Sequence, residues 1–463
     1  MAGTIHAGVG RATITPPVGI AHAGWGAQVH ERAEGVDQDF YVTVLLVLDD
    51  DASCAIVEYD TGMLAPEDAD QIRARVGDAI GIRPLDVRVS YSHTHAGPVL
   101  HRLNLLEGME LVAPYWETLF SQTVGAARQA RHTLRPARVG AGFGSSGIAV
   151  NRRLPLPEGR TVCSQNVTGF TDRTITVARI DALDGSPIAA IVGYACHPIT
   201  LAFQNRLLSP DYPGVVRSVV EHLTGATCLF LQGCAGDQMP VEALTGDVRV
   251  HRRLGTQLGA EAAATYLRID PEGRRWVFDH VVESGAPLGL QRAEAGSPGP
   301  GGLRVATRTV TMPLRPVGDM ESLATARDSV RDELAQLRAA SAPDAVIADG
   351  MFRLKRAEMR CSWWEWFDGR DTVDLELHGV RIGPFATVGF PGEPFASIGA
   401  TVRERSPFPF TLMCGYTNGW RGYVPTRDAF PVGGYEVEWG SAFDEGAADV
   451  LIEGSLALLE ELR

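Results

Sequence analysis

The sequence contains two histidines separated by a single residue, within the segment SHTHAGP at 92–98. The residues before it, DVRVSY at 86–91, alternate in the manner of a β-strand. Side chains at positions i and i+2 of an extended chain face the same side, so we expect His93 and His95 to point into one space. Two imidazoles at a strand end predict a metal or catalytic site, against the alternative of two polar loop residues.

Two further residues suit the same site. His197 follows an apolar strand in YACHPIT at 194–200. Alone it reads as a structural histidine, but beside the pair His93 and His95 it becomes the natural third ligand. Glu393 lies in FPGEPF at 390–395, where burial is costly unless a cation compensates the carboxylate. The alternative is a solvated turn glutamate. Two imidazoles and one carboxylate favour Zn²⁺ over Mg²⁺.

The loop GCAGD at 233–237 follows another strand-like run. Its glycines permit successive backbone N–H groups to bind an oxyanion, although a tight turn is the simpler reading. We expect Asp237 to orient one of the ligand histidines from behind.

Composition limits the classes of protein to consider. The chain has 463 residues, 45% hydrophobic and 21% charged, which suits one large domain or two smaller ones. The net charge of −14 disfavours nucleic acids and anionic membranes as partners. No stretch of about 18 apolar residues and no secretory signal is found, so we expect no membrane insertion. Seven scattered cysteines without a CxxC motif indicate free thiols and a cytoplasmic protein.

Strand and helix patterns alternate along the chain, which predicts an α/β fold with mixed multi-stranded sheets flanked by helices. We expect a single large catalytic domain over 1–463, with ligand groups at strand ends. The loop SPGPGG at 297–302 separates two lobes, 1–296 and 303–463. The expected strands are 41–48, 55–57, 86–91, 174–180, 188–195, 226–231, 373–380 and 384–390, with an extended segment at 138–150; the expected helices are 65–80, 112–132, 211–223, 252–267, 320–359 and 443–462.

Several motifs resemble, in the same order, those of the neutral (non-lysosomal) ceramidase family. They are GVGRATITPP at 8–17, SHTHAGP, Asn151-Arg152, ACHPIT with SPDYPG at 209–214, LQGCAGDQMP at 231–240, FPGEPF, and GYTNGWRGYVPT at 415–426 with GGYEVE at 433–438. The resemblance covers almost the whole chain. It is to the catalytic domain only, with no C-terminal immunoglobulin-like domain expected.

The resemblance implies roles for individual residues. His93, His197 and Glu393 would bind zinc, with Tyr423 as a further ligand or an oxyanion donor. His95 and Arg152 would hold the scissile carbonyl or its neighbour, and Tyr435 is a weaker candidate.

The implied activity is hydrolysis of a carboxamide, such as an N-acyl amine, by a metal-activated water. Zinc and Tyr423 would stabilise the oxyanion and His95 would protonate the leaving amine. The substrate would be a small or lipid-like amide, with homo-oligomer formation left open. Two alternatives stand beside it: a zinc-dependent esterase or lactonase, and a non-catalytic metal-binding protein with this fold.

Two features depart from the family pattern. Met239 stands where the family has a serine, so ceramide itself is a doubtful substrate. The segment CSWWEWFDG at 361–369 contains Trp363, Trp364 and Trp366 and has no counterpart. These tryptophans line a substrate pocket, belong to the core, or form an oligomer contact.

Overall fold

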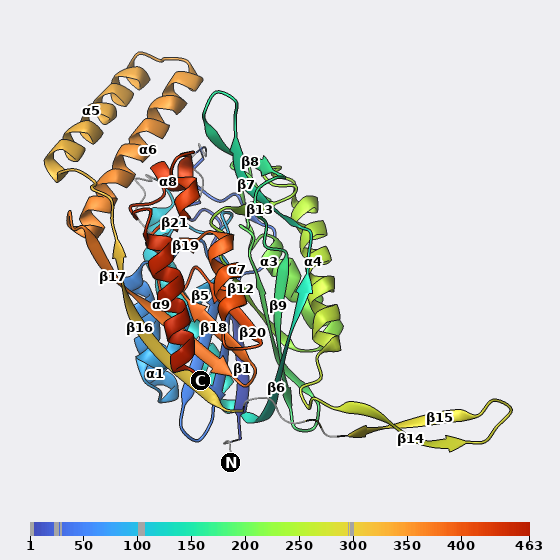
Figure 1. Ribbon diagram of the computed structural model, residues 1–463. Coiled ribbons are helices and arrows are strands. Elements are labelled where there is room, and N and C mark those ends of the chain that lie inside the picture. Colours follow the sequence, from blue (N-terminus) through green and yellow to red (C-terminus); the bar gives the residue numbers. More distant parts are fainter. Residues whose placement is uncertain (1–3, 23–26, 28–29, 101–106, 295, 297–300) are drawn as a thin grey trace.

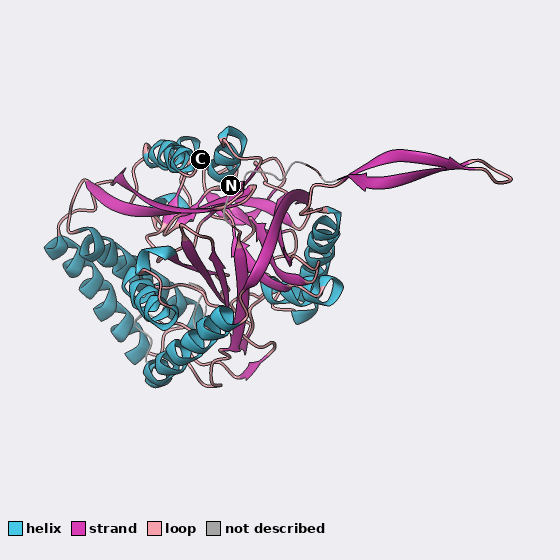
Figure 2. Cartoon of the chain, turned by 90° about the horizontal axis from the view of Figure 1, so that it is seen from below, coloured by secondary structure: helices cyan, strands magenta, loops and turns pink. Residues whose placement is uncertain are grey.

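Two β-sheets lie face to face, and helices cover their outer faces (Figures 1 and 2). The computed structural model describes residues 4–22, 27, 30–100, 107–294, 296 and 301–463. Most of the glycine-rich loop predicted at 297–302 lies outside these described residues. Side chains from both sheets meet in one buried cluster, so the two predicted lobes share a core.

The first sheet has eight strands in the order β12-β10-β9-β6-β1-β3-β4-β5. Its neighbours are antiparallel except for the pairs β10/β12 and β4/β5, which are parallel. The strands are β1 (His6–Thr13), β3 (Tyr41–Leu48), β4 (Ser53–Tyr59), β5 (Val87–Tyr91), β6 (Arg135–Ser145), β9 (Thr174–Ala182), β10 (Pro187–Tyr194) and β12 (Thr227–Gln232).

The apolar run of β3 follows from burial on both faces of this sheet. Val44 and Leu46 face the helical layer, whereas Leu45 and Val47 face the second sheet. A strand covered on both sides reads as a continuous hydrophobic run instead of an alternating one. This is why the strands predicted from such runs are found where expected.

The first sheet is strongly curled. Strands β12 and β5 stand at opposite ends of the strand order, yet β12 contacts both β4 and β5. Two isolated bridges join this region to the end of β20 (Phe410–Cys414) and the residues after it: Gly233 with Cys414, and Ser90 with Thr417. The carboxyl ends of distant strands therefore meet at one place.

The second sheet has four strands in the order β16-β17-β18-β20, with β18 and β20 parallel. Short strands complete the chain. The remaining strands are β16 (Leu303–Pro313), β17 (Thr372–Ile382), β18 (Phe385–Gly389), β2 (Gly35–Val36), β7 (Ala149–Pro155), β8 (Thr161–Asn166), β11 (Leu207–Leu208), β13 (Gln238–Pro240), β14 (Arg275–Val282), β15 (Leu288–Glu294), β19 (Glu393–Pro394) and β21 (Tyr423–Val424).

Helices pack closely on these sheets. Gly8 and Gly10 let helix α2 approach β1, because a Cβ at either position would overlap the carbonyl of Ala130 or Ala126. The α-helices are α1 (Pro66–Ile80), α2 (Val112–His132), α3 (Tyr212–Thr224), α4 (Val248–Arg268), α5 (Met320–Ala339), α6 (Asp344–Phe367), α7 (Ala396–Arg405), α8 (Tyr435–Glu438) and α9 (Ala447–Glu461). Among the described residues, none of these helices combines the length and apolar character needed to cross a bilayer.

Two sequence expectations need correction. The helical region predicted at 320–359 is two helices, because the chain turns where Ser341 takes a φ of 51° and Pro343 precedes α6. The last helix begins at Ala447, not at 443. The hairpin of β14 and β15 was not anticipated at all.

Candidate metal centre

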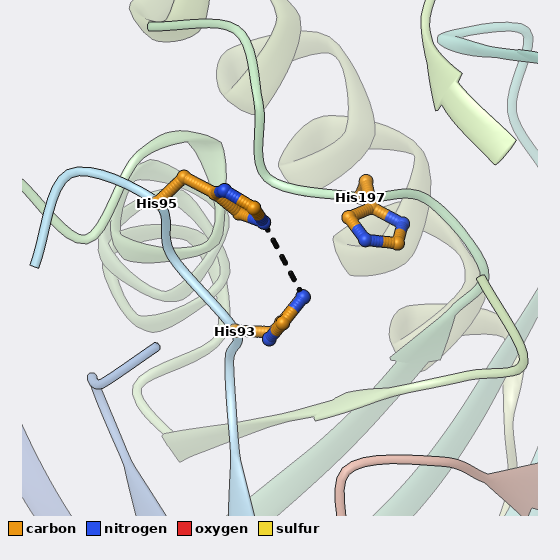
Figure 3. Close-up of side chains that lie close together, drawn as sticks. All are labelled: His93, His95 and His197. Carbon is orange, nitrogen blue, oxygen red and sulfur yellow. Dashed lines mark hydrogen bonds between the residues drawn. The ribbon is translucent and has the colours of Figure 1, made fainter. Parts of the chain in front are cut away.

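His93 follows the carboxyl end of β5, and the backbone fixes its ring. Its φ is 66°, so the chain has already left the extended conformation. The Nδ1 atom of His93 lies 2.6 Å from the carbonyl oxygen of Gly62, which assigns the ring proton to Nδ1 and a lone pair to Nε2. His93 and His95 therefore do not lie on one face of a strand, as we expected, because β5 ends at Tyr91. The turn nevertheless brings the two Nε2 atoms to 3.4 Å (Figure 3).

His197 follows β10 and is held in the same way. Its Nδ1 atom lies 2.6 Å from the carbonyl oxygen of Ala235, so its Nε2 also carries a lone pair. The rings of His93 and His197 have centroids 4.9 Å apart. The Nε2 atom of His197 is buried and makes no hydrogen bond of good geometry. Burial lowers the pKa of His197 to about 4, with Arg152 acting in the same direction.

Glu393 completes the cluster from the second lobe. Its Oε2 atom lies 3.5 Å from Nε2 of His93 and 3.0 Å from Nε2 of His197. The hydroxyl of Tyr416 donates to Oε2 at 3.1 Å, and the indole N–H of Trp420 donates to Oε1 at 2.7 Å. Burial opposes the ionised form, yet the adjacent histidines hold the pKa of Glu393 well below its usual value.

These three groups fit a metal ion. With both Nδ1 atoms engaged by carbonyls, the lone pairs of His93 and His197 face the carboxylate of Glu393. Such acceptors repel one another in a buried site unless a cation or proton lies between them. Imidazole nitrogen with carboxylate oxygen is a donor set that zinc favours.

His95 stands on the more open side of the cluster. Nitrogen atoms of His93, His95 and His197 all lie within 4.8 Å of one another, so a third imidazole is within reach of an ion (Figure 3). His95 is half-buried, whereas His93 and His197 are buried. Desolvation and the two neighbouring histidines hold the pKa of His95 well below its usual value, so its ring is neutral at pH 7.

Tyr423 and Glu393 are brought together by register. The two-residue strands β19 and β21 run parallel and pair Glu393 with Tyr423. The Tyr423 ring lies 6.2 Å from that of His197 at an angle of 15°. Burial, and then the nearby Glu393, raise the pKa of Tyr423 well above its usual value, so it is a protonated phenol at neutral pH.

Arg152, on β7, lies over the same tyrosine. Its guanidinium carbon is 5.4 Å from the centroid of the Tyr423 ring, and its Nε donates to Glu436 at 2.8 Å. Tyr435 packs edge-on against Tyr423, with centroids 5.7 Å apart. The structure therefore gathers Arg152 and both tyrosines around the cluster, next to His197.

Asp237 does not orient a ligand histidine. Its Oδ1 accepts from the backbone N–H of Ala396 at 2.8 Å, and its Oδ2 accepts from the side chain of Asn151 at 2.9 Å. The backbone carbonyl of Ala235 instead accepts the hydrogen bond that orients the ring of His197. A peptide carbonyl carries no sequence signal, which explains the error.

The loop at 233–237 is also not an open anion cradle. The N–H of Gly233 donates to Tyr194 and that of Gly236 donates to Pro394, both to backbone carbonyls. Met239 lies in β13 with its side chain buried against Val150 and Ile199.

Sequence reasoning missed Tyr416 and Trp420, the two donors to Glu393. Both belong to the quoted segment GYTNGWRGYVPT, and Tyr416 has a φ of 54° that the sequence does not reveal. Trp420 also links the site to α6: Trp363 stacks on it at 5.8 Å and Trp366 meets it edge-on at 5.7 Å. Trp363 is buried in the core, and its indole N–H donates to the carbonyl of Trp439.

Comparison with known proteins places this geometry in context. Residues 5–232 match the family described as neutral/alkaline non-lysosomal ceramidase, N-terminal. The chain is 27% identical to the neutral ceramidase of Drosophila pseudoobscura pseudoobscura over 232 residues, which are 47% of this chain and 32% of that protein. It is 28% identical to neutral ceramidase B of Dictyostelium discoideum over 138 residues, or 28% and 19% of the two chains. The matched stretches thus span about a third or less of these relatives.

The fold is shared more widely than the sequence. The crystal structure of the neutral ceramidase of Pseudomonas aeruginosa superposes with a TM-score of 0.69 at 17% identity, over 100% of this chain and 75% of that one. The three histidines and Arg152 lie within the family match, whereas Glu393 and Tyr423 lie beyond it. Residues 5–232 are thus similar to the neutral/alkaline non-lysosomal ceramidase family, and the fold of the whole chain resembles that of a solved neutral ceramidase.

Proposed function

We propose that this protein is a zinc-dependent hydrolase that cleaves the carboxamide bond of an N-acyl amine. The observation that carries the proposal is the buried meeting of His93, His197 and Glu393, whose facing acceptor atoms repel one another unless a cation or proton lies between them. The names of the curated relatives support amide hydrolysis, because they are described as ceramidases. When bound, zinc supplies Lewis acidity that makes hydroxide available at neutral pH and polarises a carbonyl.

The remaining residues act on the substrate. Tyr423 is a protonated phenol beside the cluster and donates a hydrogen bond to the carbonyl oxygen as it gains charge. Arg152 is anchored through Nε to Glu436, which leaves the outer end of its guanidinium to bind a substrate oxygen. Both groups are positioned before substrate arrives, so little reorganisation is needed.

His95 handles the proton. It is neutral at pH 7 and half-buried at the open side of the cluster, so it can take a proton from the attacking water and pass it to the leaving amine. An amine leaves poorly without that proton, whereas an alkoxide needs it less. This role favours amides over esters and lactones as substrates.

The substrate class follows from the family and from one departure. Met239 is buried in β13, packed against Val150 and Ile199, so a hydroxyl is missing where the family has a serine. We therefore propose a lipid-like N-acyl amine and treat ceramide as one member of the panel to test.

Elemental analysis of protein purified without chelator tests the proposal. We expect about one zinc per chain, lost in His93→Ala and in His197→Ala and retained in His222→Ala, an exposed histidine on α3. Turnover is then measured on matched N-acyl amides and esters. Bound zinc without turnover on either panel would support a non-catalytic metal protein, and absent metal in the wild type would refute the proposal.

A further inference from the structure

Residues 275–294 form an arm that projects from the body of the molecule (Figures 1 and 2). The arm consists of β14 and β15, which pair only with each other, from Arg275 with Glu294 to Val282 with Leu288. At about 3.3 Å per residue, eight residues of β14 span roughly 26 Å. A two-stranded sheet alone is only marginally stable in water, so such a hairpin gains stability when another surface packs against it.

One face of the arm carries no charge. Trp276, Phe278 and Val281 share it, and Trp276 and Phe278 are 69% and 64% exposed. A Cβ added to Gly289 would lie 3.3 Å from Phe278, so that ring lies over the opposite strand. Exposed aromatic side chains in a row are typical of an interaction surface.

The tip of the arm is apolar on its other face as well. Val282, Leu288 and Leu290 are each at least 40% exposed there. His280 lies opposite Leu290 and Glu283 lies in the turn at the tip, whereas the other charged groups lie nearer the body, where Arg292 pairs with Asp279 and Glu294. The six large apolar side chains of the arm expose roughly 600 Å² together, with the two aromatic rings giving about half of it.

A groove lies where the arm leaves the body. It has a volume of about 350 Å³. Its walls are the glycine-rich stretch of β6 at 139–143, the end of α4 at 268–271, and Phe410. Phe143 is partly exposed there and meets Phe410 edge-on at 5.2 Å. The groove is therefore partly apolar and large enough for a side chain from elsewhere.

We propose that two copies of this chain exchange these arms in a two-fold dimer, with each tip seated in the groove of the other copy. A two-fold axis that lays two arms antiparallel places each tip beside the other's root, where the groove lies. Pairing of the aromatic faces and seating of the tips in the grooves together remove roughly 1,200 Å² of apolar surface from water, the lower bound for a stable interface. Pairing also covers the aromatic face that a single copy leaves in water.

Charge distinguishes a second copy from a membrane. The arm carries two arginines and three carboxylates, and the whole chain has a net charge of −14. Segments that lie on anionic bilayers are rich in lysine and arginine instead. A balanced, aromatic arm fits a protein partner, and the groove at the root of the same arm favours a second copy of this chain as that partner.

Sedimentation velocity on the full chain tests the dimer. We expect a species of twice the chain mass of 49.8 kDa, and a dimer Kd raised roughly tenfold or more in the double variant Trp276→Ser, Phe278→Ser. Val167→Ser is the matched control, because Val167 is 81% exposed outside the arm. Zinc content should be the same in all three proteins, which separates this result from the proposed activity.

Crosslinking tests the arrangement without weakening it. On a Cys163→Ser background, Leu288→Cys at the tip and Arg268→Cys at the groove should give a covalent dimer together, and neither should alone. A monomer at every concentration overturns the proposal. So does a dimer that survives the double serine variant, or an arm that binds phosphatidylserine vesicles and leaves the chain monomeric.

Discussion

The two halves of the candidate metal centre are held by different kinds of partner. The first sheet supplies His93 and His197, and each ring is fixed by a backbone carbonyl. The second lobe supplies Glu393, which is fixed by the side chains of Tyr416 and Trp420. A carbonyl partner survives most substitutions, whereas a side-chain partner does not. Substitution of the residues that orient His93 and His197 should therefore leave the metal centre intact, whereas substitution of those that orient Glu393 should weaken it.

The largest effect is expected from Glu393→Gln. The amide keeps the shape of the side chain but removes the negative charge that would bind a cation beside the two imidazoles. We expect zinc content to fall from about one ion per chain to none, and hydrolysis to fall to background. Elemental analysis and circular dichroism of the same sample separate metal loss from unfolding. A fully loaded variant would mean that His95 holds the ion in place of Glu393.

His95→Gln should remove activity and leave the metal. In the proposed mechanism the half-buried ring moves the proton and does not hold the ion, so we expect zinc content to stay near that of the wild type. Turnover of an N-acyl amide should fall by roughly 10² to 10⁴. An ester with a good leaving group should suffer less. Loss of zinc in this variant would contradict the division between ligand and proton carrier.

Trp420→Phe tests the glutamate half directly. Phenylalanine keeps the stacking on Trp363 but removes the N–H that donates to Glu393. We expect zinc affinity, measured by competition with a chelator, to fall by about 10 to 100-fold. Trp366→Phe is the control, because Trp366 touches the same ring and makes no hydrogen bond to Glu393. Equal loss in both variants would assign the effect to packing.

The smallest effect on the metal is expected from Asp237→Asn. Asp237 joins the backbone of Ala396 to the side chain of Asn151 and touches no ligand histidine. We expect the free energy of unfolding to fall by about 1 to 2 kcal/mol, with zinc content unchanged. Urea denaturation and elemental analysis measure the two quantities. A weakened zinc site with normal stability would restore to Asp237 the role first predicted for it.

The strands and most helices could be predicted because their signals are local. The run from 41 to 48 is apolar because both faces of β3 are buried, and Asp211 does precede α3 as its N-cap. The curl that joins β12 to β5 involves residues far apart in the sequence, so no periodicity announces it. Only the resemblance to a family predicted that His93, His197 and Glu393 come together.

The arm shows a different kind of miss. Trp276, Phe278 and Val281 fall on one face only because a bulge lies between Phe278 and His280. The turn at 283–287 contains Gly285 and Pro287, which is a readable hairpin signal. The hairpin could therefore have been predicted from the sequence. The contacts of His93 and His197 with the carbonyls of Gly62 and Ala235 could not, because every residue has a backbone carbonyl.

The bridges from Ser90 to Thr417 and from Gly233 to Cys414 have a consequence for the order of synthesis. The ribosome releases all three histidines long before it makes Glu393, Tyr416 and Trp420. A growing chain therefore contains the three histidines before it contains Glu393, the carboxylate that completes the candidate metal centre. Loading of the proposed metal would have to wait until Glu393 has been made, and contacts of such high sequence separation form slowly. An ion bound by His93, His197 and Glu393 would therefore stabilise the chain only after both lobes have been made.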